Sequence, residues 1–204
     1  MLDRAATRLL RPALDALAQH LVRRGIGADT VTLAGFALGA AAAAAIVWRQ
    51  WSLGLALLLA SRLCDGLDGA VARQTRPSDA GAFLDITLDF LFYAGIPLAF
   101  ALADPAANAL PAAVLLAAFI GTGSSFLAFA ILAERRGLAN DAYPGKGFYY
   151  LGGLAEATET LLCFVLMCVW PAQFAWWAYG FALLCVPTIV SRIVGGWRVL
   201  RASP

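Results

Sequence analysis

Six long apolar stretches dominate this sequence, and short polar breaks separate them. They cover residues 30–48, 51–71, 81–103, 110–133, 148–170 and 174–194. Each is close to the roughly 20 residues that a helix needs to cross the hydrocarbon core of a bilayer. The apolar residues do not alternate with polar ones, which favours helices over the strands of a membrane barrel. The sequence therefore predicts an all-α, polytopic membrane protein: six transmembrane helices in a single domain over residues 1–204.

The amino-acid composition supports a membrane protein. The chain is 61% hydrophobic and 14% charged, whereas a soluble domain is about 45–50% apolar and about 25% charged. The formal net charge is only +2, which gives no reason to expect a nucleic-acid partner. We expect the basic residues to face anionic lipid headgroups instead.

The segment before the first apolar stretch, residues 1–25, has leucines at helical spacing with arginine and aspartate between them. This pattern predicts an amphipathic helix that lies in the membrane interface. A helix packed on the cytoplasmic face of the bundle fits equally well. Arginines interrupt the segment, so it does not resemble a signal peptide. Within the first stretch, Gly35 and Gly39 form a GxxxG pair, which predicts the close approach of another helix.

Basic residues gather at one side of the predicted membrane. Of the basic residues outside the six stretches, only Arg49 lies on the opposite side; the others precede the first stretch, follow the sixth or lie in the second and fourth breaks, as do Arg4, Arg24, Arg73, Arg76, Arg135, Arg136, Lys146 and Arg198. The positive-inside rule then predicts that both termini face the cytoplasm. We expect a multi-pass protein of the cell (inner) membrane.

Four aspartates stand at the cytoplasmic ends of the second and third stretches. Asp65 and Asp68 are three residues apart, and Asp85 and Asp89 are four apart, so each pair shares one helix face. A short turn makes the two helices antiparallel neighbours, so the four carboxylates can converge. The lysines and arginines nearby are too few to balance four carboxylates, so we expect divalent cations to do so. Carboxylates favour Mg²⁺, Mn²⁺ or Ca²⁺, and two such ions suit displacement at phosphorus.

Small residues accompany the acids. Gly69 and Ala72 clear one side of their helix, and Gly81 does the same at the start of the third stretch, so a ligand can lie against the backbone. Arg73 can offer its guanidinium fork to a phosphate. The competing interpretation is that interfacial acids only mark helix ends, as we expect for Asp79 and Asp104.

At these residues the sequence resembles the CDP-alcohol phosphatidyltransferase family. The family signature is D-x2-D-G-x2-A-R, a short spacer and G-x3-D-x3-D. All eight positions are filled here, by Asp65, Asp68, Gly69, Ala72, Arg73, Gly81, Asp85 and Asp89. The resemblance implies that an acceptor hydroxyl attacks the phosphate of a CDP-linked lipid, CDP-diacylglycerol, and that CMP leaves.

The resemblance also implies roles for these residues. Two divalent ions, Mg²⁺ or Mn²⁺, would be held by Asp65, Asp68, Asp85 and Asp89. Asp89 would also be the catalytic base that takes the acceptor proton. The CDP moiety would be bound by Asp65, Asp68, Gly69, Ala72, Arg73 and Gly81. Members of the family commonly form homodimers through their membrane helices.

The acceptor alcohol is less constrained. Lys146 and Arg192 are candidate ligands of an acceptor phosphate, with interfacial side chains as the alternative. Glu156 and Glu159 lie three apart inside the predicted fifth span, where acids are costly unless they face a cavity. Relatives that use inositol have arginines beside such glutamates, whereas Ala157 and Thr160 stand here. Glycerol-3-phosphate and inositol or inositol phosphate are favoured, and serine remains open.

Two other functions are alternatives to this one. The motif also allows a CDP-alcohol phosphotransferase that uses a soluble CDP-alcohol and diacylglycerol as acceptor. A divalent-cation transporter would need acids near the middle of the membrane, whereas this cluster is predicted at one face.

Overall fold

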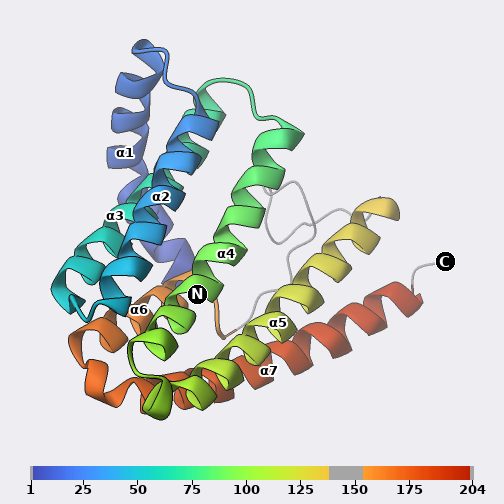
Figure 1. Cartoon of the computed structure of the whole chain (residues 1–204). Helices are drawn as coiled ribbons and strands as arrows, with labels where there is room; N and C mark the ends of the chain where they lie inside the picture. The colour runs from blue at the N-terminus through green and yellow to red at the C-terminus, as the bar shows by residue number, and fades with distance from the viewer. Residues whose placement is uncertain (1, 138–153, 203–204) are drawn as a thin grey trace.

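The structure is a computed structural model, and it describes residues 2–137 and 154–202. The described residues form helices joined by short connections, without strands. The chain runs through α1 (Leu2–Arg23), α2 (Ala28–Val47), α3 (Trp51–Gln74), α4 (Asp79–Ala103), α5 (Pro105–Arg135), α6 (Ala157–Val169), the 3₁₀ turn η1 (Pro171–Gln173) and α7 (Phe174–Ala202). The predicted all-α fold is confirmed, and Figure 1 shows the arrangement of the helices.

Four helical segments are long and apolar enough to cross a membrane: α2, α4, α5 and η1 together with α7. Helix α3 has 24 residues, but it carries the charged residues of the motif near its C-terminal end. Helix α6 has only 13 residues. The predicted fifth span, 148–170, is therefore wrong in its first half where the structure describes it, because residues 154–156 are not helical and the helix begins at Ala157.

The predicted close approach at the GxxxG pair is confirmed. Helix α2 packs against both α3 and α4. A Cβ atom added to Gly35 would lie 2.9 Å from the Cβ of Cys64, and one added to Gly39 would lie 2.6 Å from the Phe92 ring. Only glycine lets the three backbones come this close, and this packing fixes the helices that carry the acidic residues.

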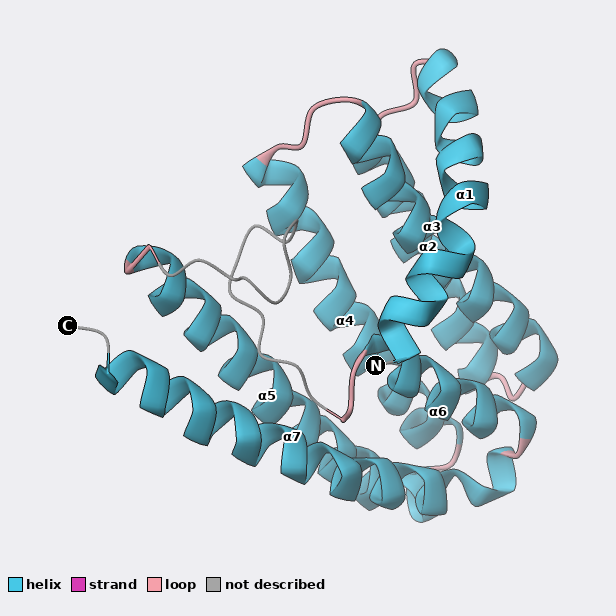
Figure 2. Cartoon of the chain, turned by 180° about the vertical axis from the view of Figure 1, so that it is seen from behind, coloured by secondary structure: helices cyan, strands magenta, loops and turns pink. Residues whose placement is uncertain are grey.

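Helix α1 packs along α3 and also reaches α6 (Figure 2). Its Ala18 is fully buried, and Leu14 and Leu21 pack with it against Ala70 and Val71 of α3. The apolar side chains in the second half of α1 thus pack on the bundle, as the second of the two predicted alternatives for this helix expects.

The main apolar core lies at the opposite end of the bundle from the acidic residues. Phe100 stacks between Trp51 and Phe174, with ring centroids 5.5 and 4.7 Å apart. Phe164 contacts Phe92 and Phe119 edge-on. This core joins α2 to α7, and leaves the other end of α3 and α4 for polar groups.

Candidate active site

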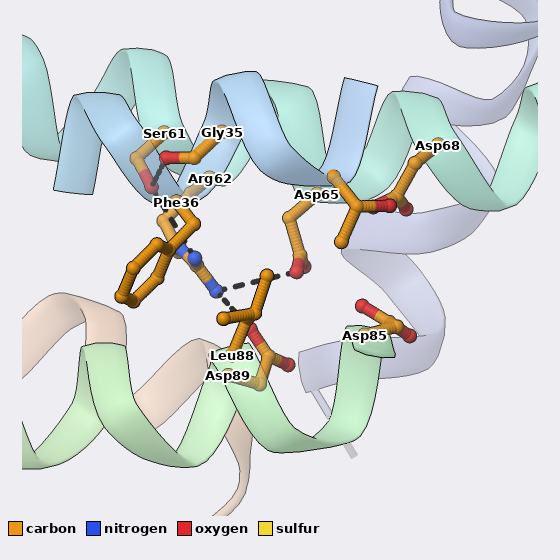
Figure 3. Close-up of a pocket in the computed structure, with 10 residues that line it drawn as sticks. Gly35, Phe36, Ser61, Arg62, Asp65, Asp68, Asp85, Leu88 and Asp89 are labelled. Carbon is orange, nitrogen blue, oxygen red and sulfur yellow. Dashed lines mark hydrogen bonds and ion pairs between the residues drawn. The ribbon is translucent and has the colours of Figure 1, made fainter. Parts of the chain in front are cut away.

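The carboxylates of Asp65, Asp85 and Asp89 converge between α3 and α4 (Figure 3). Each offers one oxygen, and these oxygens all lie within 4.8 Å of one another. Asp65 comes from the C-terminal half of α3, and Asp85 and Asp89 occupy successive turns of α4. Helix α2 packs against both α3 and α4, which make little direct contact with each other, and the carboxylates meet in the space between those two helices. The convergence predicted from the helical spacing is confirmed for these three residues. We call them the acidic cluster.

Asp68, the fourth predicted carboxylate, is held slightly apart. Its Oδ2 accepts a hydrogen bond of 2.7 Å from the Thr32 hydroxyl of α2, and the residue is only 5% exposed. It lines the small cavity at the acidic cluster as well as the groove beside it. Asp68 therefore connects the cluster to the groove. The spacing of the motif gave no sign of Thr32, because this partner lies 36 residues earlier.

One basic residue that sequence reasoning did not single out lies beside the carboxylates. Arg62 of α3 donates from Nη1 to Oδ1 of Asp89 at 2.7 Å, and the same Nη1 lies 3.4 Å from Oδ1 of Asp65. The Arg62 side chain is 10% exposed, and its guanidinium carbon lies 3.7 Å from the centroid of the Phe92 ring. The site thus contains its own cation, which offsets one of the four negative charges.

A signal for Arg62 was present in the sequence. It is a charged residue inside a predicted span, one helical turn before Asp65, and three-residue spacing places the two side chains on one face. Its Nε is buried and has no hydrogen-bond partner among the residues that the structure describes. An unsatisfied buried donor costs about 1–3 kcal/mol, so the contacts with the carboxylates and the rings have to offset that cost.

A groove of about 190 Å³ runs from the acidic cluster past the N-terminus of α4. Its lining includes five of the eight motif residues: Asp68, Gly69, Ala72, Gly81 and Asp85. Ser78, the N-cap of α4, also lines it and accepts a hydrogen bond of 3.0 Å from the Gly81 amide. Asp29 and Arg76 complete a rim that sequence reasoning did not single out.

The small residues leave space for a ligand at the groove. A Cβ atom on Gly69 would meet only Nη1 of Arg73, at 3.3 Å. At Gly81 an added Cβ atom would lie 2.9 Å from a carboxylate oxygen of Asp29. Gly69 is therefore open toward the groove, whereas Gly81 also lets the α2 carboxylate approach α4.

Arg73 lies over Gly69 rather than among the groove-lining residues. Its Nη2 is 3.7 Å from Oδ1 of Asp15 in α1, and its side chain is 52% exposed. The amide of Gln74 also bonds α1, through the Asp15 carbonyl at 2.9 Å. Asp15 is thus a neighbour of Arg73 that the motif did not predict.

Three of the four candidate acceptor ligands lie among the described residues. Lys146 lies outside the described residues. Glu156 is the N-cap of α6 and forms a capping box with Glu159, whose carboxylate accepts from the Glu156 amide at 3.2 Å. Arg192 is 7% exposed, and its Nη1 donates to the Thr122 carbonyl of α5 at 3.1 Å. The two glutamates therefore begin a helix instead of lying in its middle.

The donor set of the acidic cluster suits hard divalent cations. All three members are carboxylates, and Mg²⁺ and Mn²⁺ prefer such oxygen ligands. The three oxygens are close enough for a single ion to contact all of them after small adjustments of the side chains. The cluster has the chemistry of a metal site next to a groove that can take a phosphate-bearing ligand.

Comparisons with known proteins agree with this arrangement. The family described as CDP-alcohol phosphatidyltransferase matches residues 26–193. Inner membrane protein YnjF of Escherichia coli is 50% identical over 202 residues, which cover 99% of this chain and 98% of that protein. The archaetidylinositol phosphate synthase of Methanothermobacter thermautotrophicus is 43% identical over 84 residues, 41% of this chain and 42% of the synthase.

Solved structures share the fold. The Mycobacterium tuberculosis phosphatidylinositol phosphate synthase with CDP-DAG bound superposes with a TM-score of 0.66 at 22% identity, covering 90% of this chain and 93% of that one. The same enzyme in complex with manganese and citrate gives the same TM-score and covers 88% of its chain. The match over residues 26–193 shows that the chain belongs to the CDP-alcohol phosphatidyltransferase family of enzymes.

Proposed function

We propose that the protein transfers a phosphatidyl group from CDP-diacylglycerol to the hydroxyl of a small polar alcohol and releases CMP. One observation carries the proposal: five motif residues from α3 and α4 line a single groove, and the acidic cluster lies at its end. Membership of an enzyme family leaves a divalent-cation transporter without support.

Each part of the groove has a role in the proposed reaction. Asp65, Asp68, Asp85 and Asp89 are proposed to hold two divalent ions, Mg²⁺ or Mn²⁺. When bound, these ions would neutralise the diphosphate and stabilise the leaving CMP. Gly69, Ala72 and Gly81 are proposed to accommodate the CDP moiety against the helix backbones, and Arg73 to contact a phosphate from above Gly69.

Asp89 is proposed as the base. It stands one turn after Asp85, farther from the groove-lining start of α4, where an acceptor hydroxyl can approach the phosphorus. A carboxylate within hydrogen-bond reach of that hydroxyl removes its proton as the new phosphodiester bond forms.

For the acceptor we propose a phosphorylated polyol, with inositol phosphate ahead of glycerol-3-phosphate. The support is that two relatives, the archaeal synthase and a phosphatidylinositol phosphate synthase of Streptomyces avermitilis, carry inositol phosphate in their names. Lys146 and Arg192 are the proposed phosphate ligands. Glu156 and Glu159 remain candidates for the polyol hydroxyls, although their capping box already occupies part of their hydrogen-bonding capacity.

The proposed setting is the inner membrane, which is also the location in the name of the relative YnjF. We propose six membrane-crossing helices, α2 to α7, with the acidic cluster and both termini on the cytoplasmic side. A homodimer formed through the membrane helices is part of the same proposal.

A substrate screen tests the function. Purified protein in lipid micelles would receive CDP-diacylglycerol and one acceptor at a time: inositol phosphate, glycerol-3-phosphate, inositol or serine. We expect CMP release with one phosphorylated polyol, in the presence of Mg²⁺ or Mn²⁺, and its loss in excess chelator. CMP release only from CDP-choline with diacylglycerol would instead identify the phosphotransferase of opposite polarity. Full activity in chelator would contradict the metal sites.

A further inference from the structure

Arg62 lies at the acidic cluster but outside the eight-residue motif. Its Nη1 bonds Oδ1 of Asp89 at 2.7 Å and lies 3.4 Å from Asp65, so one guanidinium nitrogen bridges a carboxylate of α4 and a carboxylate of α3 (Figure 3). Among the described basic side chains, Arg62 alone is paired with the cluster. The Arg62 guanidinium is thus a fixed positive charge beside residues that are proposed to bind metal ions.

The guanidinium has little freedom to move away. The Phe92 ring lies 3.7 Å from its central carbon and the Tyr93 ring 5.6 Å away. Its Nη2 donates to the Ser61 hydroxyl at 3.3 Å, and that hydroxyl is itself fixed by a 2.7 Å bond to the Gly35 carbonyl. A planar fork held in this way presents its N–H groups in one fixed direction.

This fixed direction determines the position of the Asp89 carboxylate. Because Oδ1 accepts the short bond from Arg62, the carboxylate cannot rotate freely, and Oδ2 stays outside that bond. An isolated carboxylate beside Asp65 and Asp85 would turn away from their negative charges. Arg62 offsets this repulsion, because its positive charge lies between Asp89 and Asp65.

We propose that Arg62 is a positioning residue for Asp89. It holds the carboxylate in the orientation needed to accept the acceptor proton, and its charge lowers the affinity of the cluster for divalent cations. The proposal rests on the proposed function, in which Asp89 is the base. It predicts an uncommon combination: a variant without the guanidinium binds metal more tightly and reacts more slowly.

The first test measures metal binding without any substrate. Mn²⁺ binding to the purified full-length protein would be followed by electron paramagnetic resonance for wild type, Arg62→Gln and Arg62→Lys. Loss of one positive charge near the ions should tighten Mn²⁺ binding about tenfold in Arg62→Gln. Arg62→Lys keeps the charge and should stay near wild type. A purely structural role for Arg62 predicts weaker binding in both variants.

The matched control is Arg49→Gln. Arg49 also bonds across helices, donating to the Ala103 carbonyl at 2.8 Å and pairing with Asp104, but at the opposite end of the bundle. This variant removes an arginine and an ion pair without touching the cluster. Its Mn²⁺ affinity and CMP release should equal those of wild type, and a change as large as that of Arg62→Gln would overturn the proposal.

The second test asks whether Arg62 acts through Asp89. Arg62→Gln should lower CMP release about 100-fold, the scale of a lost general base, whereas binding of labelled CDP-diacylglycerol should be unchanged. In an Asp89→Asn background the same change should lower CMP release further by less than about threefold, because residues acting as a unit are not additive. A full second loss would overturn the positioning role.

The outcomes separate this proposal from the proposed function. Unchanged Mn²⁺ affinity and CMP release in Arg62→Gln, with an active wild type, would overturn only the role of Arg62. A wild-type protein that binds Mn²⁺ but releases no CMP with any acceptor would overturn the proposed function instead, and the positioning role with it. Arg62→Lys guards against a folding failure, because it restores the charge at nearly the same volume.

Discussion

Asp89 contacts the Arg62 guanidinium on one side and the carboxylates of Asp65 and Asp85 on the other. Replacing its carboxylate therefore distinguishes a role in substrate binding from a role in the reaction itself. Asp89→Asn preserves the shape of the side chain and its bond from Arg62 but removes the proton acceptor. We expect CMP release to fall about 100-fold or more while labelled CDP-diacylglycerol still binds. Single-turnover CMP release and lipid binding, measured on the same preparation, check this.

The control for Asp89→Asn is Asp79→Asn. Asp79 lies on the same helix but is exposed in its first turn, outside the acidic cluster. It should retain wild-type turnover. If Asp89→Asn turns over like wild type, the base has to be another group, and Glu156 is the next carboxylate to test.

Gly69 provides a test of the groove. An added Cβ atom meets only the flexible end of Arg73, so Gly69→Leu should fold and should fill the space proposed for CDP. We expect binding of labelled CDP-diacylglycerol to fall at least about tenfold, because a ligand cannot share volume with the new side chain. The melting temperature in detergent should change little.

Gly180→Leu is the matched control, because Gly180 of α7 is exposed and has nothing within 4 Å of an added Cβ atom. Equal donor binding in both leucine variants would mean that the groove is not the CDP site. Ala72→Phe, on the same face of α3, should reproduce the effect of Gly69→Leu.

For individual residues, the sequence predicted contacts only where spacing along a helix determines which side chains share a face. The convergence of Asp65, Asp85 and Asp89 follows from offsets of three and four residues plus one short turn. The hydrogen bonds from Arg62 to Asp89 and from Thr32 to Asp68 were not predicted, because each joins two different helices. The partners are 27 and 36 residues apart in the sequence, respectively. Such contacts depend on how the helices are rotated against each other, which apolar spans without a strong polar face do not specify.

Among the elements, α6 differs most from its prediction. The apolar residues at both ends of 148–170 predict a single span, although Gly152, Gly153, Glu156 and Glu159 interrupt the segment, and the start of the helix at Ala157 was therefore not predicted. The structure explains the start: Glu156 and Glu159 form a capping box, and Thr188 of α7 accepts from the amides of Leu154 and Ala155, each at 3.0 Å. The predicted ends of the long helices α2, α3 and α4 lie within three residues of the observed ones, because turns and charged residues mark these ends in the sequence.

Thr188 tests this helix start. Thr188→Val keeps the volume but leaves two backbone amides without their acceptor, which costs about 1–3 kcal/mol per buried group. We expect a lower melting temperature and faster hydrogen exchange in peptides that contain residues 154–156. Thermal unfolding in detergent and exchange followed by mass spectrometry check both effects.

Thr188→Ser is the control, because it retains the accepting hydroxyl and should behave nearly as wild type. Slow exchange in Thr188→Val would mean that another acceptor replaces the hydroxyl, and the capping box alone would then account for the start of α6.

Over the whole molecule, charge divides the two ends of the bundle. Arg24, Arg76 and Arg136 lie beyond helix ends on the side of the acidic cluster, whereas Arg49 lies at the α2–α3 turn on the other side. Trp48 and Trp176 are 74% and 79% exposed at that second end, as expected for side chains at a membrane interface. The distribution of the arginines supports the proposed cytoplasmic position of the cluster, whereas the tryptophans mark only a membrane interface.

Single cysteines would test this orientation. Cys163, Cys168 and Cys185 are buried and Cys64 is half-buried, so the background reaction with a membrane-impermeant maleimide should be low. Gln50→Cys, at an exposed turn, should react in intact spheroplasts, whereas Ser78→Cys should react only after permeabilisation. The unsubstituted chain is the control, and the reverse pattern would place the site on the outer side.

The short helix α6 has a consequence for the depth of its first residues. Its thirteen residues rise about 20 Å, whereas the hydrocarbon core is about 30 Å thick, so in the proposed six-span arrangement the start of α6 lies below the level of the lipid headgroups. Non-helical backbone at such a depth is stable only inside protein or beside water. Ala155 and Glu156 are buried, and the Thr188 hydroxyl accepts from the amides of Leu154 and Ala155. Helix α7 therefore lets a helix shorter than the bilayer begin inside the protein without exposing these backbone amides to lipid.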